Sequence, residues 1–130
     1  MLADNLTDEQ LTPNFRLSEF RCPCCNDVIH DAATKLAQQL QPVRDGYGPI
    51  RIRSGYRCAK QNQRVKGARF SQHLLGLAAD IDCRLNGDRF ALVKLLLEHG
   101  FKRIGIAANH IHADIGTPTG PVIWTYYTST

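Results

Sequence analysis

The chain has 130 residues, of which 43% are hydrophobic, and it carries a formal net charge of +4 at pH 7. This length supports one hydrophobic core, because two separate domains would each bury too little apolar surface. No segment approaches the roughly 20 consecutive apolar residues that span a bilayer, so we expect a soluble protein without membrane insertion. The basic residues stand singly and form no long run, so nucleic acid is not the expected partner. An anionic cell envelope would account for the positive charge as well as nucleic acid would.

The N-terminal segment is expected to be a lead-in that precedes the folded domain. Residues 1–16 are polar and include Pro13, which predicts a loosely ordered stretch that docks through Leu17 and Phe20. The domain should then span residues 17–130. The first residues lack a basic region followed by an apolar stretch, so we expect no signal peptide.

Two helices are predicted from the spacing of apolar residues. Over residues 31–44 these residues recur at intervals of three and four, which indicates one face of an amphipathic helix. A second helix should begin with Asn86 or Asp88 as its cap and end at Gly100. Its nearly continuous apolar content predicts deep burial.

Five short segments are predicted as strands, and residues 54–56 are predicted as a turn that leads into a polar, Gln-rich segment ending near Gly67. Helices and mostly antiparallel strands would combine in a single small α+β domain, with the helices flanking the sheet. The strand candidates are residues 49–53, 78–83, 103–107, 111–115 and 122–126.

The five cysteines do not define a framework of disulfides, because their number is odd and one thiol must stay unpaired in a monomer. Cys22 and Cys25 have Cys-x-x-Cys spacing, but a zinc ribbon needs a second ligand pair at a comparable spacing. Neither Cys58 nor Cys83 belongs to such a pair. We expect reduced thiols that lie near one another, and a metal site or a disulfide among Cys22, Cys24 and Cys25 remains the alternative.

Titratable side chains concentrate in two segments that alternate with a period of two. In SQHLLGLAADIDC, which contains His73, a strand would put Asp80 and Asp82 on one face. In NHIHADIG the same period sets three residues on one side: His110, His112 and Asp114. If such a row of polar groups were buried without partners, each group would cost on the order of 1–3 kcal/mol, and a bound cation would satisfy them together.

Imidazole and carboxylate groups in this combination favour zinc over other common cations. Catalytic zinc sites keep three protein ligands and leave a fourth position open. Calcium and magnesium would require more oxygen ligands. The alternative is that the strand histidines simply face solvent.

The same residues resemble the signature of a known family. The pattern S-x-H-x-x-G-x-A-x-D from Ser71 to Asp80, followed by H-x-H, is similar to that of the zinc D-Ala-D-Ala carboxypeptidases, peptidase family M15. The upstream RIRSGYRC resembles this family's strand and turn, and LSEFRCPCC resembles the opening of many phage-type members. The resemblance extends from about Leu17 to Gly116, and Hedgehog signalling domains share the zinc motifs.

The resemblance implies a Hedgehog/DD-peptidase-like fold and one zinc ion per chain, held by His73, Asp80 and His112. Zinc in such a site activates water for attack on a peptide carbonyl. Arg57 matches the arginine that holds the substrate carboxylate or the developing oxyanion, and its planar guanidinium suits either task.

The general base is the position at which this chain departs from the family pattern. Many relatives have Glu or Asp three residues before the last zinc histidine, whereas this chain has Asn109, which cannot take up a proton. His110 is therefore the first candidate for general base and acid. Asp114 is the second candidate for the general base. Alternatively, its carboxylate orients His112 or His110 by a hydrogen bond without binding the metal itself.

The resemblance implies a metallopeptidase that cleaves peptidoglycan stem peptides, as a D-Ala-D-Ala carboxypeptidase or an L-Ala-D-Glu endopeptidase. A bacteriophage endolysin fits best, because it is made in the host cytoplasm and reaches the cell wall without an export signal of its own. One alternative is an inactive, zinc-stabilised binding module, for which Asn109 is the main reason. The other is a structural α+β domain whose histidines happen to align.

Overall fold

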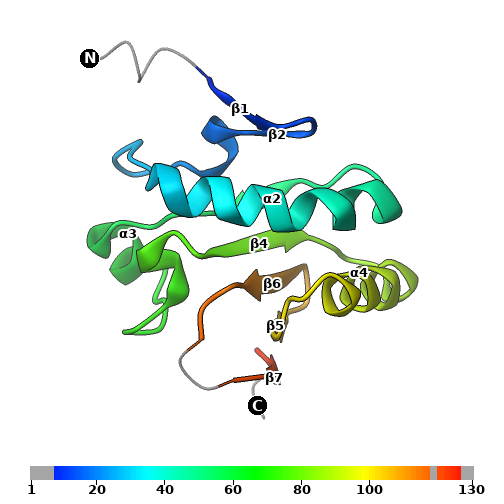
Figure 1. Ribbon diagram of the computed structural model, residues 1–130. Helices are drawn as coiled ribbons and strands as arrows, with labels where there is room; N and C mark the ends of the chain where they lie inside the picture. Colours follow the sequence, from blue (N-terminus) through cyan, green and yellow to red (C-terminus); the bar gives the residue numbers. More distant parts are fainter. Residues whose placement is uncertain (1–7, 118–119, 127–130) are drawn as a thin grey trace.

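The computed structural model describes residues 8–117 and 120–126, so the start of the predicted lead-in, residues 1–7, and the last four residues lie outside the described part. Within that part, one sheet has the strand order β3-β4-β6-β5-β7 (Figure 1). Neighbouring strands are antiparallel except β5 and β7, which are parallel. The predicted α+β fold with a mostly antiparallel sheet is confirmed. The strands are β3 (Ile52–Ser54), β4 (Ala78–Asp82), β5 (Arg103–Ile106), β6 (His110–Asp114) and β7 (Val122–Thr125).

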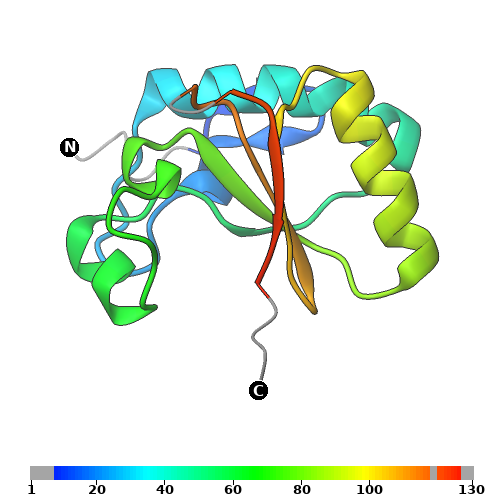
Figure 2. The same cartoon turned by 90° about the horizontal axis from the view of Figure 1, so that it is seen from below.

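The helices α2 (His30–Tyr47) and α4 (Asn86–Glu98) pack against the apolar face of the sheet. This face is built by alternate strand residues such as Ile81, Ile104 and Ile111, all fully buried. Figure 2 views the sheet from its β7 edge, so the strands overlap and α4 lies beside them. The opposite face of the sheet is turned away from this core. The side chains on that face include the polar residues that alternate with the apolar ones along the strands. The sheet therefore has a core face and a polar face.

The predicted deep burial of α4 is wrong. Leu92 and Leu96 are fully buried, but Phe90 is 73% exposed and Leu97 is 48% exposed. Only one side of this helix packs against α2 and the sheet, and its other side faces solvent. The predicted cap also differs, because Leu85 occupies the cap position and no side chain makes a capping hydrogen bond.

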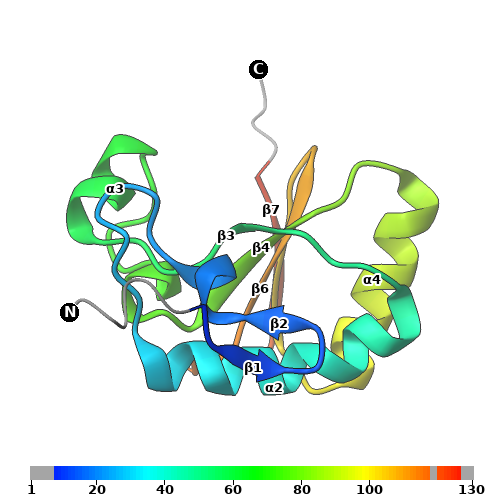
Figure 3. The ribbon, with the colours of Figure 1, turned by 90° about the horizontal axis from the view of Figure 1, so that it is seen from above.

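Residues 10–16 form a β-hairpin, so this part of the lead-in is not loosely ordered. The strands β1 (Gln10–Thr12) and β2 (Phe15–Arg16) pair antiparallel, and the hairpin lies on α2 (Figure 3). Phe15 is fully buried in the core. The 3₁₀ helix η1 (Leu17–Phe20) follows, and both of its end residues are buried, as predicted for the docking residues.

Two short helices in the middle of the chain were not predicted, because one has a polar sequence and the other has only four residues, too few to show an apolar period. They are α3 (Ala59–Arg64) and the 3₁₀ helix η2 (Gln72–Leu75). The Ser71 side chain accepts a hydrogen bond from the His73 backbone at the start of η2. Gly76 ends η2 in the left-handed region, at a φ of 74° that favours glycine.

None of the helices in the described ranges has the length and apolar content that crossing a membrane requires.

Candidate metal centre

The candidate site lies on the polar face of the central strands β4 and β6. These strands pair antiparallel with Asp80 opposite His112 and Asp82 opposite His110. Directly opposed residues point to the same face of a sheet, so the pairing brings together the two segments that the period of two singled out. Neither segment alone could indicate that they are adjacent.

His73 reaches the same face from η2, and its ring is only 2% exposed. Its Nδ1 lies 2.7 Å from the backbone carbonyl oxygen of Gly55, and its Nε2 lies 3.2 Å from Oδ1 of Asp80. A carbonyl oxygen can only accept a hydrogen bond, so Nδ1 carries the proton. The Nε2 lone pair of the neutral ring is then directed at the Asp80 carboxylate.

In His112 the two ring nitrogens have the opposite roles to those in His73. Its Nδ1 lies 3.1 Å from Oδ1 of Asp80, and its Nε2 lies 2.7 Å from Oδ2 of Asp114. Asp114 also accepts hydrogen bonds from the Arg103 side chain and the Gly116 backbone. This contact with a second carboxylate is the usual way in which a protein orients a histidine that binds metal through its other nitrogen.

The ligand atoms of His73, Asp80 and His112 all lie within 4.8 Å of one another, and the three residues are buried. With both outer nitrogens occupied by acceptors, the neutral rings direct two lone pairs at a carboxylate oxygen. Three acceptors without a positive charge between them would repel one another. Two imidazoles and a carboxylate match the ligands of catalytic zinc, so the residues present fit this ion.

The pKa values of Asp80 and His112 are shifted by the contacts among these residues. Burial acts to raise the pKa of Asp80, but the hydrogen bonds and charges of His112 and His73 hold it well below its usual range. Burial acts to lower the pKa of His112, whereas Asp114 and Asp80 raise it above its ordinary value. Asp80 therefore stays ionised, which is the form of a carboxylate that binds a metal ion and that pairs with the guanidinium of Arg57.

Arg57 lies beside the cluster and is held in place by three side chains. Its guanidinium donates to Oδ2 of Asp80 over 3.1 Å, to Oδ1 of Asn62 over 3.1 Å and to Oγ of Ser54 over 3.2 Å. Gly67 leaves room for this arrangement, since a Cβ atom there would come within 2.1 Å of the Asn62 oxygen. Asn62 and Ser54 were not predicted as site residues, because nothing in a polar segment distinguishes a buried partner from a solvated one.

His110 borders the cluster from the next site-facing position of β6. Its Nε2 lies 3.8 Å from Oδ2 of Asp80, and its ring is half-buried against Tyr126. The Trp124 ring lies 5.2 Å from that of His112. These two aromatic residues were predicted only as part of a strand, since the sequence did not reveal the parallel pairing of β7 with β5.

All six residues proposed for catalysis and zinc binding line one pocket of about 640 Å³. Asp82 is not part of this lining. It forms ion pairs with Arg51 and Arg53 and remains partly exposed at the end of β4. The six residues are Arg57, His73, Asp80, His110, His112 and Asp114.

Comparison with known proteins agrees with the geometry of this site. No curated protein sequence matches the chain. The family described as peptidase M15 matches residues 13–114, which contain β4, β6 and all six pocket residues named above. Because this match covers most of the chain, the protein belongs to peptidase family M15.

Proposed function

We propose that this chain is a zinc-dependent peptidase that hydrolyses peptidoglycan stem peptides. The observation that carries the proposal is the convergence of His73, Asp80 and His112 at one side of an open pocket, with the outer nitrogen of each histidine already bound. Zinc bound there would polarise a peptide carbonyl and activate water for its hydrolysis. The remaining pocket residues can then be assigned to binding and proton transfer.

His110 is the proposed general base and acid. Burial lowers the pKa of its imidazole, and this effect outweighs the attraction of Asp80. A lowered pKa keeps the ring neutral at pH 7, which is the form that accepts a proton. Asn109, at the position where many relatives have a carboxylate, is exposed and has no such capacity.

Asp114 is better suited to positioning than to proton transfer. Its carboxylate is 1% exposed and is already bound by His112, Arg103 and the Gly116 backbone. A base must reach the proton that it accepts, and a carboxylate enclosed in this way does not. We therefore assign to Asp114 the orientation of His112.

The walls of the pocket suit an extended peptide that carries carboxylates. Arg57 and Lys66 contribute positive charge, and Phe70, which is 81% exposed, contributes apolar surface. Stem peptides combine small apolar side chains with free carboxylates, and the guanidinium of Arg57 matches a carboxylate or oxyanion. We place the site of action at the bacterial cell wall, in the manner of a phage endolysin.

The test is metal content together with clearing of bacterial walls stripped of their outer membrane. About one zinc ion in this pocket and clearing that stops after chelation are the expected results. Mass analysis of the released peptides would then separate a carboxypeptidase, which frees D-alanine, from an endopeptidase. Zinc in the pocket without hydrolysis of any wall peptide would favour the second candidate, an inactive binding module, for which Asn109 is the specific observation.

Replacing Asp114 with asparagine should lower the zinc affinity of the pocket by about 10- to 100-fold, because loss of a partner behind a metal-bound histidine has effects of this size. Competition with a chromophoric chelator measures the change. Asp82→Asn is the matched control, since Asp82 pairs with arginines outside the pocket lining. Equal zinc affinities for the two variants would contradict the positioning role.

Replacing Arg57 with lysine should lower kcat/KM by about 10- to 100-fold while zinc content stays unchanged. Lysine keeps the charge next to Asp80 but loses the planar guanidinium, and a hydrogen bond to a charged group contributes about 1.5–3 kcal/mol. Steady-state hydrolysis of a synthetic stem peptide measures the effect. Arg64→Lys, at an exposed position in α3, is the control, and an unchanged kcat/KM for the Arg57 variant would exclude substrate binding by Arg57.

A further inference from the structure

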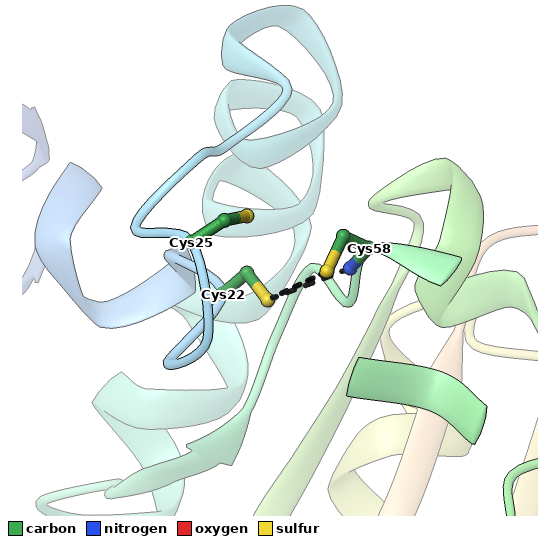
Figure 4. Close-up of side chains that lie close together, drawn as sticks. All are labelled: Cys22, Cys25 and Cys58. Atoms are coloured by element: carbon green, nitrogen blue, oxygen red, sulfur yellow. Dashed lines mark hydrogen bonds between the residues drawn. The ribbon is translucent and has the colours of Figure 1, made fainter. Parts of the chain in front are cut away.

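Three cysteine thiols converge at a second place, outside the pocket described above. The sulfur atoms of Cys22, Cys25 and Cys58 all lie within 4.8 Å of one another (Figure 4). The first two come from the loop after η1, and Cys58 comes from the turn that precedes α3. The sequence contains no second ligand pair to match the Cys-x-x-Cys spacing, but the fold brings a third thiol to it from a distant turn.

The distance between two of these sulfur atoms differs from that of a disulfide bond and is compatible with a shared metal ion. Sγ of Cys22 lies 3.7 Å from Sγ of Cys58. A disulfide bond would require about 2.05 Å. Zinc–sulfur bonds of about 2.3 Å at tetrahedral angles place neighbouring sulfur atoms about 3.8 Å apart. The observed separation corresponds to a hydrogen bond between the two thiols, and it also matches the spacing of two ligands of one tetrahedral ion.

The backbone around Cys22 is arranged to stabilise a thiolate. The backbone N–H of Cys58 donates a hydrogen bond to the Cys22 sulfur over 3.5 Å, and the backbone N–H groups of Cys24 and Cys25 also donate to this sulfur. The thiolate is the form of cysteine that binds metal. Asn26 follows with a φ of 64°, in the left-handed region that only a few residue types adopt readily, and this conformation turns the chain sharply after Cys25.

The Cys58 sulfur is held in a similar way, since it accepts a hydrogen bond from the Gln61 backbone over 3.4 Å. Cys22 is fully buried and Cys25 is exposed, so the cluster lies at the surface with its inner side shielded. Cys24 lies next to these residues in the chain but is not one of the converging thiols. This difference makes Cys24 an internal control.

We propose that Cys22, Cys25 and Cys58 form a second metal site that binds zinc or a similar thiophilic divalent ion. Three soft thiolates select such ions over calcium or magnesium. They leave one position of a tetrahedral ion for a solvent ligand.

The proposed ion would connect the N-terminal segment to the turn that carries Arg57. Arg57 is the residue immediately before Cys58, and the Tyr56 backbone donates a hydrogen bond to the Phe20 carbonyl over 2.9 Å. Gly55 lies so close to Phe20 that a Cβ atom would come within 2.7 Å of its backbone. A metal bridge between Cys22 and Cys58 would fix this contact and, with it, the turn from which Arg57 reaches Asp80.

Cobalt substitution tests this site separately from the peptidase pocket. Cobalt bound to thiolates gives a strong near-ultraviolet charge-transfer absorption, which histidine and carboxylate ligands do not produce. We expect this absorption in the full chain purified under reducing conditions, and about two zinc ions per chain in the zinc form. The His112→Ala variant should lose about one zinc ion and keep the absorption, so failure of the pocket would not be mistaken for failure of the thiol site.

Cys58→Ser is the informative variant, because a serine oxygen can also accept the Gln61 hydrogen bond and should preserve the start of α3. It should lose most of the thiolate absorption and about one zinc ion, whereas Cys24→Ser should keep both. No thiolate absorption in the full chain would overturn the proposal, and this result requires no variant to fold. A disulfide between Cys22 and Cys58, found by peptide mass analysis without reduction, would also overturn it.

Discussion

Replacing His73 or His112 with alanine should remove zinc from the pocket and stop peptide hydrolysis at the same time. Each histidine provides one of the nitrogens directed at Asp80, and each is almost completely buried. Two protein ligands are too few for a catalytic zinc site. Metal polarisation of a carbonyl contributes several kcal/mol, so kcat/KM should fall by about a thousandfold or more.

Elemental analysis and hydrolysis of a synthetic stem peptide, carried out on the same preparations, measure the two effects together. His30→Ala is the control, because His30 pairs with Glu9 at the surface and lies outside the pocket. Near-ultraviolet circular dichroism would show whether the buried variants remain folded. Hydrolysis at the original rate by a folded variant without zinc in the pocket would exclude the metal-dependent reaction, whatever the cysteine cluster binds.

The polar face of the sheet was predictable because the alternation of polar and apolar residues indicates both the strands and the side chains that share a face. In β6, His110, His112 and Asp114 alternate with apolar residues, and β4 repeats the pattern with Asp80. A period of two fixes which side chains share a face, whatever the neighbouring strand is. The sequence could therefore indicate the ligand types and the face, and the family motif indicated that the two strands work together.

The supporting interactions could not be predicted, because they depend on contacts between segments without a shared pattern. Arg57 is held by Ser54 and Asn62 only because the turn before α3 folds back toward β4. Trp124 reaches His112 because β7 runs parallel to β5, which no periodicity indicates. Cys58 likewise lies beside Cys22 and Cys25 because of a contact between distant segments that no periodicity indicates. Burial of α4 was overestimated since apolar content alone does not show how many sides of a helix are covered.

Replacing His110 with alanine should leave zinc in the pocket and lower kcat by about 10²- to 10⁴-fold, the usual contribution of a general acid or base. His110 contributes none of the converging ligand atoms, and its Nε2 lies 3.8 Å from the Asp80 carboxylate at the edge of the pocket. KM should change little, because the walls that hold the peptide remain. Added imidazole should restore part of the rate, since a small base can occupy the space left by the side chain.

His99→Ala is the matched control, because His99 follows α4 and does not line the pocket. Loss of zinc in the His110 variant would mean that this histidine supports the metal instead of transferring protons. Full activity with zinc retained would contradict the assignment of the base. It would not transfer the role to Asp114, whose two oxygens are bound by His112, Arg103 and the Gly116 backbone. The proton would then have to be taken up by the substrate or by solvent, and wall hydrolysis by this chain would be correspondingly slow.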